Sequence, residues 1–255
     1  MNKQQAKKII KQNKEVYNKI ASHFSNTRSY LWDDLKPLRD YVKNGDRVLD
    51  LGCGNGRLYQ LFSGLSITYV GLDQSEELIK IARSHVPEAE FVVHDMTELP
   101  FPDDSFDIIY CIAALQHIPK EELRLQTLRE MKRVLCPGGW VVMTNWNLHS
   151  AEVKKKAEIR NWTYSPVGIT SLYGKLEIGK YEFLVPWLND RGEVLGKRYY
   201  HGFTIEELEE LFLAAGFEVA EQYYTSKGKK SSKQEPGNIV SLLFSCYEGL
   251  YSIAR

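Results

Sequence analysis

Short apolar runs alternate with amphipathic segments between residues 46 and 146. Five of the runs are rich in β-branched residues and are typical of strands: 47–51, 67–72, 90–95, 106–112 and 140–146. Residues 76–85 have a helical pattern behind Ser75 as an N-cap, and residues 121–134 predict a second helix that ends before Pro137. Strands that alternate with helices predict an α/β fold with a parallel sheet of βαβ units.

The pattern changes after residue 146. Residues 147–200 hold aromatic, proline and glycine residues without helix or strand periodicity, so we expect a lid or substrate cap there. A helical pattern returns at residues 204–216, where Thr204 and Glu207 fit a capping box. Two strand patterns follow at 217–226 and 238–248, and their short connection predicts an antiparallel hairpin at the sheet edge.

These segments predict a single domain over residues 1–255. Its parts are an N-terminal helical arm (1–45), a core (46–146), a cap insertion (147–200), and a C-terminal helix with the edge hairpin (201–255). Hydrophobic residues at 43% and charged residues at 26% fit a globular protein. No apolar run approaches the roughly 20 residues that span a bilayer, so no membrane partner is expected. The four cysteines form no CxxC pair, which predicts no metal site and favours the cytoplasm.

Charge constrains the partners. The chain has 33 basic and 33 acidic residues, and a net charge of zero counts against nucleic-acid binding through bulk charge. Two segments are nevertheless locally basic: the first fourteen residues, with five lysines, and the loop at 226–233. Each is either a solvated surface or a contact to a phosphate backbone.

Three glycines, Gly52, Gly54 and Gly56, directly follow the first strand, as in loops that bind nucleotides. A P-loop needs a Lys-Ser/Thr pair after the glycines, and none follows here. The dinucleotide fingerprint needs a third glycine where Arg57 stands. Asp50, just before the loop, would repel a pyrophosphate and attract a cation such as the amino-acid part of S-adenosylmethionine (SAM).

Two further acids end the next two strands. Asp73 is placed to accept both ribose hydroxyls, and Asp95, with Met96 beside it, suits an adenine amino group and ring. Acids at the carboxyl ends of three successive strands lie along one edge of a doubly wound sheet, where ligands bind. They suit a cation, a ribose and an adenine in order, which predicts SAM as cofactor and S-adenosylhomocysteine as product. The cofactor site is also expected to include Gln74, Ile112 and Tyr17, unless Tyr17 is a core aromatic.

The acids and glycines, together with "LPFPDDSFDIIYCIAALQHI" (99–118), resemble the class I SAM-dependent methyltransferases. The resemblance covers residues 46–145 and implies a Rossmann-like sheet of seven strands, mostly parallel with an antiparallel last strand. Segments 16–32, 184–187 and 198–203 are similar to the methyltransferases that esterify carboxymethyl-uridine at the tRNA wobble position. This narrower resemblance implies tRNA as a partner. The eukaryotic members of that group use a small zinc-binding activator subunit, which leaves such a partner open here.

A carboxylate acceptor would already be ionised at neutral pH, so it would need positioning and positive charge but no general base. In the segments that carry the resemblance, Arg198 and His201 are catalytic candidates, and Arg28 and Tyr199 are substrate-binding candidates. The resemblance to class I enzymes adds His117, which follows the fourth strand, as a catalytic candidate, and Trp146 is a further substrate-binding candidate. Each also has a purely structural interpretation, as a capping, pinning or packing residue.

Two other functions stay open. One is a small-molecule O- or N-methyltransferase on the same fold, in which a neutral hydroxyl acceptor would need His117 or His201 as a base. The other is a SAM-binding protein without catalysis, which the intact series of acids makes the weakest alternative.

Overall fold

The computed structural model describes residues 1–153, 155, 163–165, 169–170, 177–178 and 181–245, and an eight-stranded sheet forms its core, in the order β12-β11-β13-β5-β4-β1-β2-β3. Five strands in the first part of the chain pair in parallel. They are β1 (Arg47–Leu51), β2 (Thr68–Asp73), β3 (Glu90–Val93), β4 (Phe106–Ile112) and β5 (Leu135–Trp146). Since the strand order reverses beside β1, the carboxyl ends of β1 and β4 form the switch point at which such sheets bind ligands. The predicted doubly wound α/β fold is confirmed.

Three strands near the end of the chain complete the sheet: β11 (Glu218–Ser226), β12 (Lys229–Ser231) and β13 (Asn238–Phe244). β13 lies between β5 and β11 and is antiparallel to both, which confirms the reversed last strand. The predicted hairpin thus lies at this end of the sheet, with β13 as its inner strand and β11 as its outer one. The strand count is eight, not seven, because Lys229–Ser231, expected in a loop, pairs with the end of β11.

Both faces of the sheet are buried. Helices α3 (Glu121–Val134) and α5 (Ile205–Ala214) cover one face, and η1 (Asp33–Tyr41), η2 (Arg57–Phe62) and α2 (Glu76–His85) cover the other. Neighbouring residues of a strand serve different cores: Ile108 and Tyr110 pack on the η1 side, while Ile109 and Cys111 pack on the α3 side. Strands that are buried on both faces are apolar at most positions, which explains the nearly continuous apolar runs of the sequence.

The predicted helix starts are largely confirmed. Ser75 Oγ accepts the Leu78 amide at 3.2 Å and caps α2, and Thr204 Oγ1 accepts the Glu207 amide at 3.2 Å and caps α5. The reciprocal half of the predicted capping box is not formed. The Glu207 carboxylate instead contacts His201 and Arg124, two side chains from other elements.

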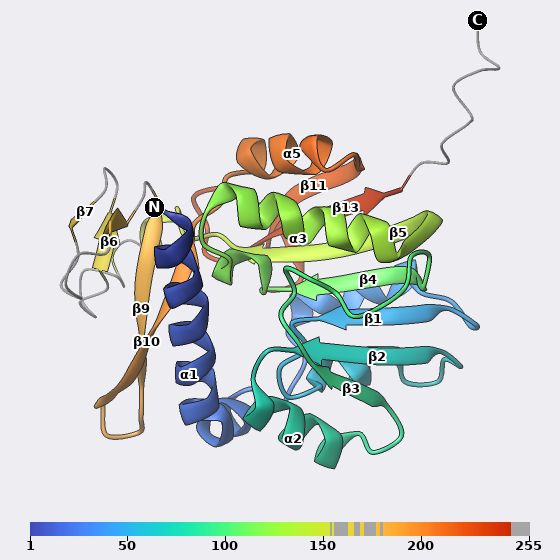
Figure 1. The fold of residues 1–255 in the computed structure, drawn as a ribbon, viewed down its shortest axis with the longest axis horizontal. Helices are drawn as coiled ribbons and strands as arrows, with labels where there is room; N and C mark the ends of the chain where they lie inside the picture. The colour runs from blue at the N-terminus through green and yellow to red at the C-terminus, as the bar shows by residue number, and fades with distance from the viewer. Residues whose placement is uncertain (154, 156–162, 166–168, 171–176, 179–180, 246–255) are drawn as a thin grey trace, which may run out of the picture.

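The N-terminal arm and the cap lie across the carboxyl edge of the sheet, where β1, β2 and β4 end (Figure 1). The arm is the long helix α1 (Lys3–Thr27), which packs against β10 (Val194–His201). β10 forms a hairpin with β9 (Glu182–Leu188), which also pairs with β6 (Thr163–Ser165), and β7 (Ile169–Thr170) pairs with β8 (Glu177–Ile178). Residues 154, 156–162, 166–168, 171–176 and 179–180 of the predicted cap, and the last residues of the predicted strand 238–248, lie outside the described residues.

Within the described part of the chain, no helix combines the length and apolar character that crossing a membrane would require.

One buried side chain joins α1 to the cap. Asn13 is 1% exposed; its Nδ2 donates to the Tyr199 carbonyl at 3.1 Å, and its Oδ1 accepts the Tyr199 amide at 2.7 Å. The Asn13 amide thus acts toward β10 as a neighbouring strand would.

We predict that Asn13→Ala lowers the free energy of unfolding by about 1–3 kcal/mol, because it leaves the buried Tyr199 amide without a partner. Urea denaturation followed by circular dichroism measures the change. Asn26→Ala, at an exposed position of the same helix, is the matched control and should change stability by less than about 0.5 kcal/mol. Equal effects of the two variants would contradict the joining role of Asn13.

Candidate functional site

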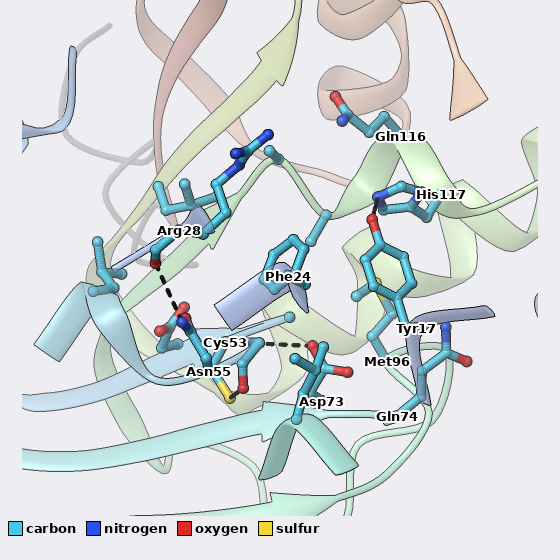
Figure 2. A pocket seen from close by; sticks show the side chains of 18 of the residues that line it. Tyr17, Phe24, Arg28, Cys53, Asn55, Asp73, Gln74, Met96, Gln116 and His117 are labelled. Carbon is cyan, nitrogen blue, oxygen red and sulfur yellow. Dashed lines mark hydrogen bonds between the residues drawn. The ribbon is translucent and has the colours of Figure 1, made fainter. Parts of the chain in front are cut away.

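A cavity lies at the carboxyl edge of the sheet, beneath α1 and β10 (Figure 2). The structure brings most of the sequence-predicted site residues together around it. These are Tyr17, Arg28, Asp50, Gly52, Gly54, Asp73, Gln74, Asp95, Met96, Ile112, His117, Trp146 and Arg198. Gly56, Tyr199 and His201 do not line it.

The glycine loop takes its shape from close contacts. Gly52 has a φ of 80°, and a Cβ atom there would lie 2.4 Å from the Cβ of Ala114, so only glycine fits between β1 and the segment after β4. Gly54 has a φ of 56° and donates its amide to Asp73 Oδ2 at 3.0 Å. Gly56, with a φ of 75°, packs beside Phe91 below the loop and not at the cavity. Its part is therefore to shape the loop and not to touch a ligand.

Helix α1 covers the glycine loop from above. Tyr17 and Phe24, seven residues apart, line the cavity from one face of α1, and Arg28 lines it from the C-cap position of this helix. Figure 2 shows these three side chains at the cavity. The buried side chain of Asn55 donates to Ser25 Oγ at 3.0 Å and to the Arg28 carbonyl at 3.2 Å. Phe24 and Asn55 were not predicted as site residues. The helical spacing of Phe24 from Tyr17 could have predicted that Phe24 lies on the same helix face. The role of Asn55 depends on its hydrogen bonds to Ser25 and Arg28, which are distant in sequence.

Asp50 is the most buried of the acids, at 1% exposed. Burial raises its pKa to about 7, against the opposing effects of the Tyr69 hydroxyl, which donates to Asp50 Oδ2 at 2.6 Å, and of the Arg57 charge. Because a nearby cation would favour the ionised form, the carboxylate is suited to bind one at neutral pH.

Asp73 and Asp95 keep acceptor capacity for a ligand. Asp73 uses Oδ1 for the Ser75 amide at 2.8 Å and Oδ2 for the Gly54 amide, two of about four acceptor sites of a carboxylate. Burial raises the pKa of Asp73, and these backbone hydrogen bonds oppose the rise. Asp95 accepts the Thr97 amide and hydroxyl on the same oxygen, Oδ1, at 2.9 Å each.

His117 is held from both sides of its ring. Nδ1 lies 2.9 Å from the Tyr199 carbonyl, and Nε2 lies 3.0 Å from the Tyr17 hydroxyl. A carbonyl only accepts, so Nδ1 carries the proton and Nε2 accepts from Tyr17. Burial and the charge of Arg198 lower the pKa of His117 to about 3. His117 is thus neutral, orients Tyr17, and is a weak base.

Arg198 is a buried cation without a buried acid. It is 4% exposed, its Nη1 donates to the Tyr17 hydroxyl at 3.3 Å, and its guanidinium carbon lies 4.7 Å from the Trp187 ring centre. It pairs with no acid of the described residues, and its buried Nε has no hydrogen-bond partner among them. Such a group is costly unless an anion joins it. Tyr200, two positions on, lines the same cavity and was missed, although strand alternation would have found it.

The same alternation places Tyr199 and His201 on the other face of β10. His201 lies between Glu182 Oε1 (3.3 Å from Nδ1) and Glu207 Oε1 (2.6 Å from Nε2), so both of its ring nitrogens are engaged by carboxylates. Arg124 contacts both carboxylates and the Tyr199 hydroxyl, each at 3.4 Å. The geometry therefore does not support His201 as a catalytic residue or Tyr199 as a substrate-binding residue.

An outer groove continues from the cavity. Five residues line both: Arg28, Trp32, Trp146, Trp187 and Arg198. Trp146 stacks on Tyr200 with ring centres 5.1 Å apart, which fixes its ring at the boundary of the two spaces. Aromatic faces beside guanidinium groups suit a flat acceptor that carries negative charge.

Comparisons with known proteins agree with this geometry. A methyltransferase domain model matches residues 49–143. A tRNA (carboxymethyluridine(34)-5-O)-methyltransferase of Schizosaccharomyces pombe is 30% identical over 228 residues, which are 82% of this chain and 90% of the relative. One of the same name from Arabidopsis thaliana is 35% identical over 148 residues, 58% of this chain but 35% of that longer protein.

Among solved structures, a Haloferax volcanii methyltransferase in complex with the Trm112 methyltransferase activator has a TM-score of 0.63 at 21% identity. The match covers 92% of this chain and 98% of that one. At this identity the similarity shows the fold alone.

The raised pKa of Asp50 should make SAM affinity depend on pH. We predict that SAM affinity rises as pH increases from about 6 to about 7.5, because the positively charged amino-acid end favours ionised Asp50. Calorimetry in buffers of different ionisation enthalpy should detect proton release on binding. Asp50→Asn should bind more weakly and lose both effects.

The stability of the ligand-free protein should depend on pH in the opposite direction. Because the pKa of Asp50 in the folded state exceeds its ordinary value of 3.8, the contribution of Asp50 to the free energy of unfolding declines as pH rises toward about 7. An Asp50→Asn variant whose SAM affinity keeps the wild-type pH dependence would contradict the assignment.

Proposed function

The chain belongs to the family of tRNA (carboxymethyluridine(34)-5-O)-methyltransferases, and from that premise we propose that it methyl-esterifies a carboxymethyl-type uridine at the tRNA wobble position. It is a SAM-dependent methyltransferase. The observation that carries the substrate proposal is the buried guanidinium of Arg198, which faces the cavity without an acid partner among the described residues.

The donor set of the cavity fits SAM, which when bound supplies an electrophilic methyl group. Asp50 would hold the amino-acid cation, Asp73 the ribose hydroxyls, and Asp95 with Met96 the adenine, beside Gln74 and Ile112. Tyr17 and Phe24 from α1 line the same cavity and would shield the bound cofactor from water.

The acceptor end fits a carboxylate better than a neutral hydroxyl. Arg198 offers donors and positive charge to an ionised carboxylate, which needs no proton removed. A hydroxyl acceptor would need a base. The two histidines suggested for that role are unsuited, because both ring nitrogens of His117 are hydrogen-bonded and its pKa is low, and His201 lies on the far face of β10. The small-molecule hydroxyl alternative loses its main support.

The outer groove suits the rest of a nucleotide. A wobble base is read from a single-stranded loop, and such bases stack on aromatic rings and guanidinium planes. Trp32 and Trp146 provide such rings, and Arg28 adds positive charge.

Two partners complete the proposal. Exposed lysines on α1 (Lys3, Lys7, Lys8 and Lys11) and near β12 (Lys227, Lys229, Lys230 and Lys233) would contact the phosphate backbone. A small activator subunit would assist binding, by analogy with the Haloferax methyltransferase that is found with Trm112.

The direct test uses labelled SAM and tRNA pretreated with mild alkali to remove existing methyl esters. We expect label in one modified uridine after digestion to nucleosides, and its release as methanol in mild base, since esters hydrolyse there and methyl ethers and N-methyl groups do not. Label confined to small metabolites, or stable to base, would contradict the proposal.

A variant tests the acceptor role of Arg198. We predict that Arg198→Met lowers kcat/KM for tRNA by roughly 30- to 1,000-fold, about 2–4 kcal/mol, through loss of a buried charge contact. S-adenosylhomocysteine affinity should change less than about threefold. Arg191→Gln, at an exposed position in the same hairpin, is the control. A loss of cofactor affinity as large as the loss of activity would instead place Arg198 in the cofactor site.

The pH profile separates the two acceptor classes. At saturating SAM and tRNA, kcat should stay flat between about pH 5.5 and 8, because neither a carboxylate acceptor nor His117, with a pKa near 3, titrates there. His117→Gln should lower the rate without changing the profile. A tenfold fall per pH unit below about pH 6.5 would indicate a titrating base and a hydroxyl acceptor.

A further inference from the structure

Arg57 directly follows the glycine loop and begins η2. Its guanidinium carbon lies 4.2 Å from the Trp32 ring centre, and the side chain lines the same cavity as Asp50. Its Nη1 atom is buried and has no hydrogen-bond partner among the residues that the structure describes. A buried, unsatisfied donor is costly, so this placement calls for an acceptor that a ligand brings.

A second cation reinforces the need. Arg28 lines the same cavity from the end of α1, with its guanidinium carbon 5.5 Å from the Trp187 ring centre. The Asn55 side chain bonds the Arg28 carbonyl at 3.2 Å and so holds this residue beside the loop. Burial, and next the charge of Arg28, lower the pKa of Arg57 to about 10. An anion bound to both guanidinium groups would oppose this lowering of the pKa of Arg57.

The position of Arg57 along the sheet edge identifies the anion. Asp95 follows β3, Asp73 ends β2 and Asp50 lies near the end of β1, and Arg57 lies at the β1 end with Asp50. In the orientation of the proposed function, this end receives the amino-acid part of SAM. That part carries an ammonium group, which Asp50 complements, and a carboxylate, which no acid can bind.

We propose that Arg57, reinforced by Arg28, binds the α-carboxylate of SAM while Asp50 binds its α-ammonium group, so that the site recognises the amino-acid end as a zwitterion. This assignment rests on the proposed cofactor orientation and not on the identity of the acceptor. It also accounts for the guanidinium that stands where a dinucleotide-binding loop needs its third glycine.

Calorimetry with SAM and decarboxylated SAM tests the assignment, since the two ligands differ only in the α-carboxylate. The wild type should bind SAM roughly 10- to 100-fold more tightly than the decarboxylated form, as expected for a charge-assisted contact. Arg57→Gln should bind the two ligands equally, with the loss confined to SAM. Arg129→Gln, exposed on α3, should retain the wild-type ratio. Asp50→Asn should weaken both ligands, because both keep the ammonium group.

Three results would overturn the inference. The first is an affinity ratio between SAM and decarboxylated SAM that is unchanged in Arg57→Gln, and the second is an equal loss of affinity for both ligands. The third is a normal affinity for SAM with a raised KM for tRNA, which would assign Arg57 to the acceptor site. If Arg57→Gln does not fold, Arg57→Lys and Arg28→Gln are measured with the same two ligands. A reduced ratio of the affinity for SAM to that for decarboxylated SAM would support the inference, and an unchanged ratio would overturn it. No acceptor is present, so the outcome is independent of whether tRNA is the substrate.

Discussion

The packing of α1 across the carboxyl edge of the sheet is the contact on which the chemistry of the cavity depends. Polar side chains make this packing specific: Asn13 bonds the backbone of β10, Asn18 bonds Ser75 Oγ at 2.6 Å at the start of α2, and Asn55 bonds the end of α1. Without this cover, Asp50 would lose part of its burial, and the charges around it would interact through water. The helix thus turns an ordinary ligand-binding edge into an enclosed space.

Two kinds of buried charge lie on the two sides of β10, and they have different roles. Arg124, Glu182, His201 and Glu207 form a balanced cluster, in which each of the two basic side chains contacts both carboxylates, and it joins β9, β10, α3 and α5. Arg57 and Arg198 have no acid bonded to them in the described chain. The balanced cluster holds the cap hairpin in place, and the hairpin in turn directs Arg198 into the cavity. The paired charges join elements of the fold, whereas Arg57 and Arg198 line the cavity.

This division explains why one strand carries residues of both kinds. Along β10, Arg198 and Tyr200 face the cavity, while Tyr199 and His201 face the opposite side. Arg198, Tyr199 and His201 were all predicted for the site, and the alternation of the strand separates the first of them from the other two. His117 was placed correctly beside the cavity, yet its hydrogen bonds give it the role of orienting Tyr17 and not that of a base.

Local pattern alone determined the elements of this protein: which segments form strands and helices, where Ser75 and Thr204 cap, and that Asp50, Asp73 and Asp95 meet at one edge. These features depend on period, on capping chemistry and on the geometry of parallel strands, all of which act over short distances in sequence. Only the tertiary structure decided that α1 covers the site, that Lys229–Ser231 adds an eighth strand, and that Arg57 and Arg198 are the buried guanidinium groups that the described chain leaves with unpartnered atoms. The physical reason is that burial and pairing are set by contacts between residues far apart in the chain, such as Asn13 with Tyr199.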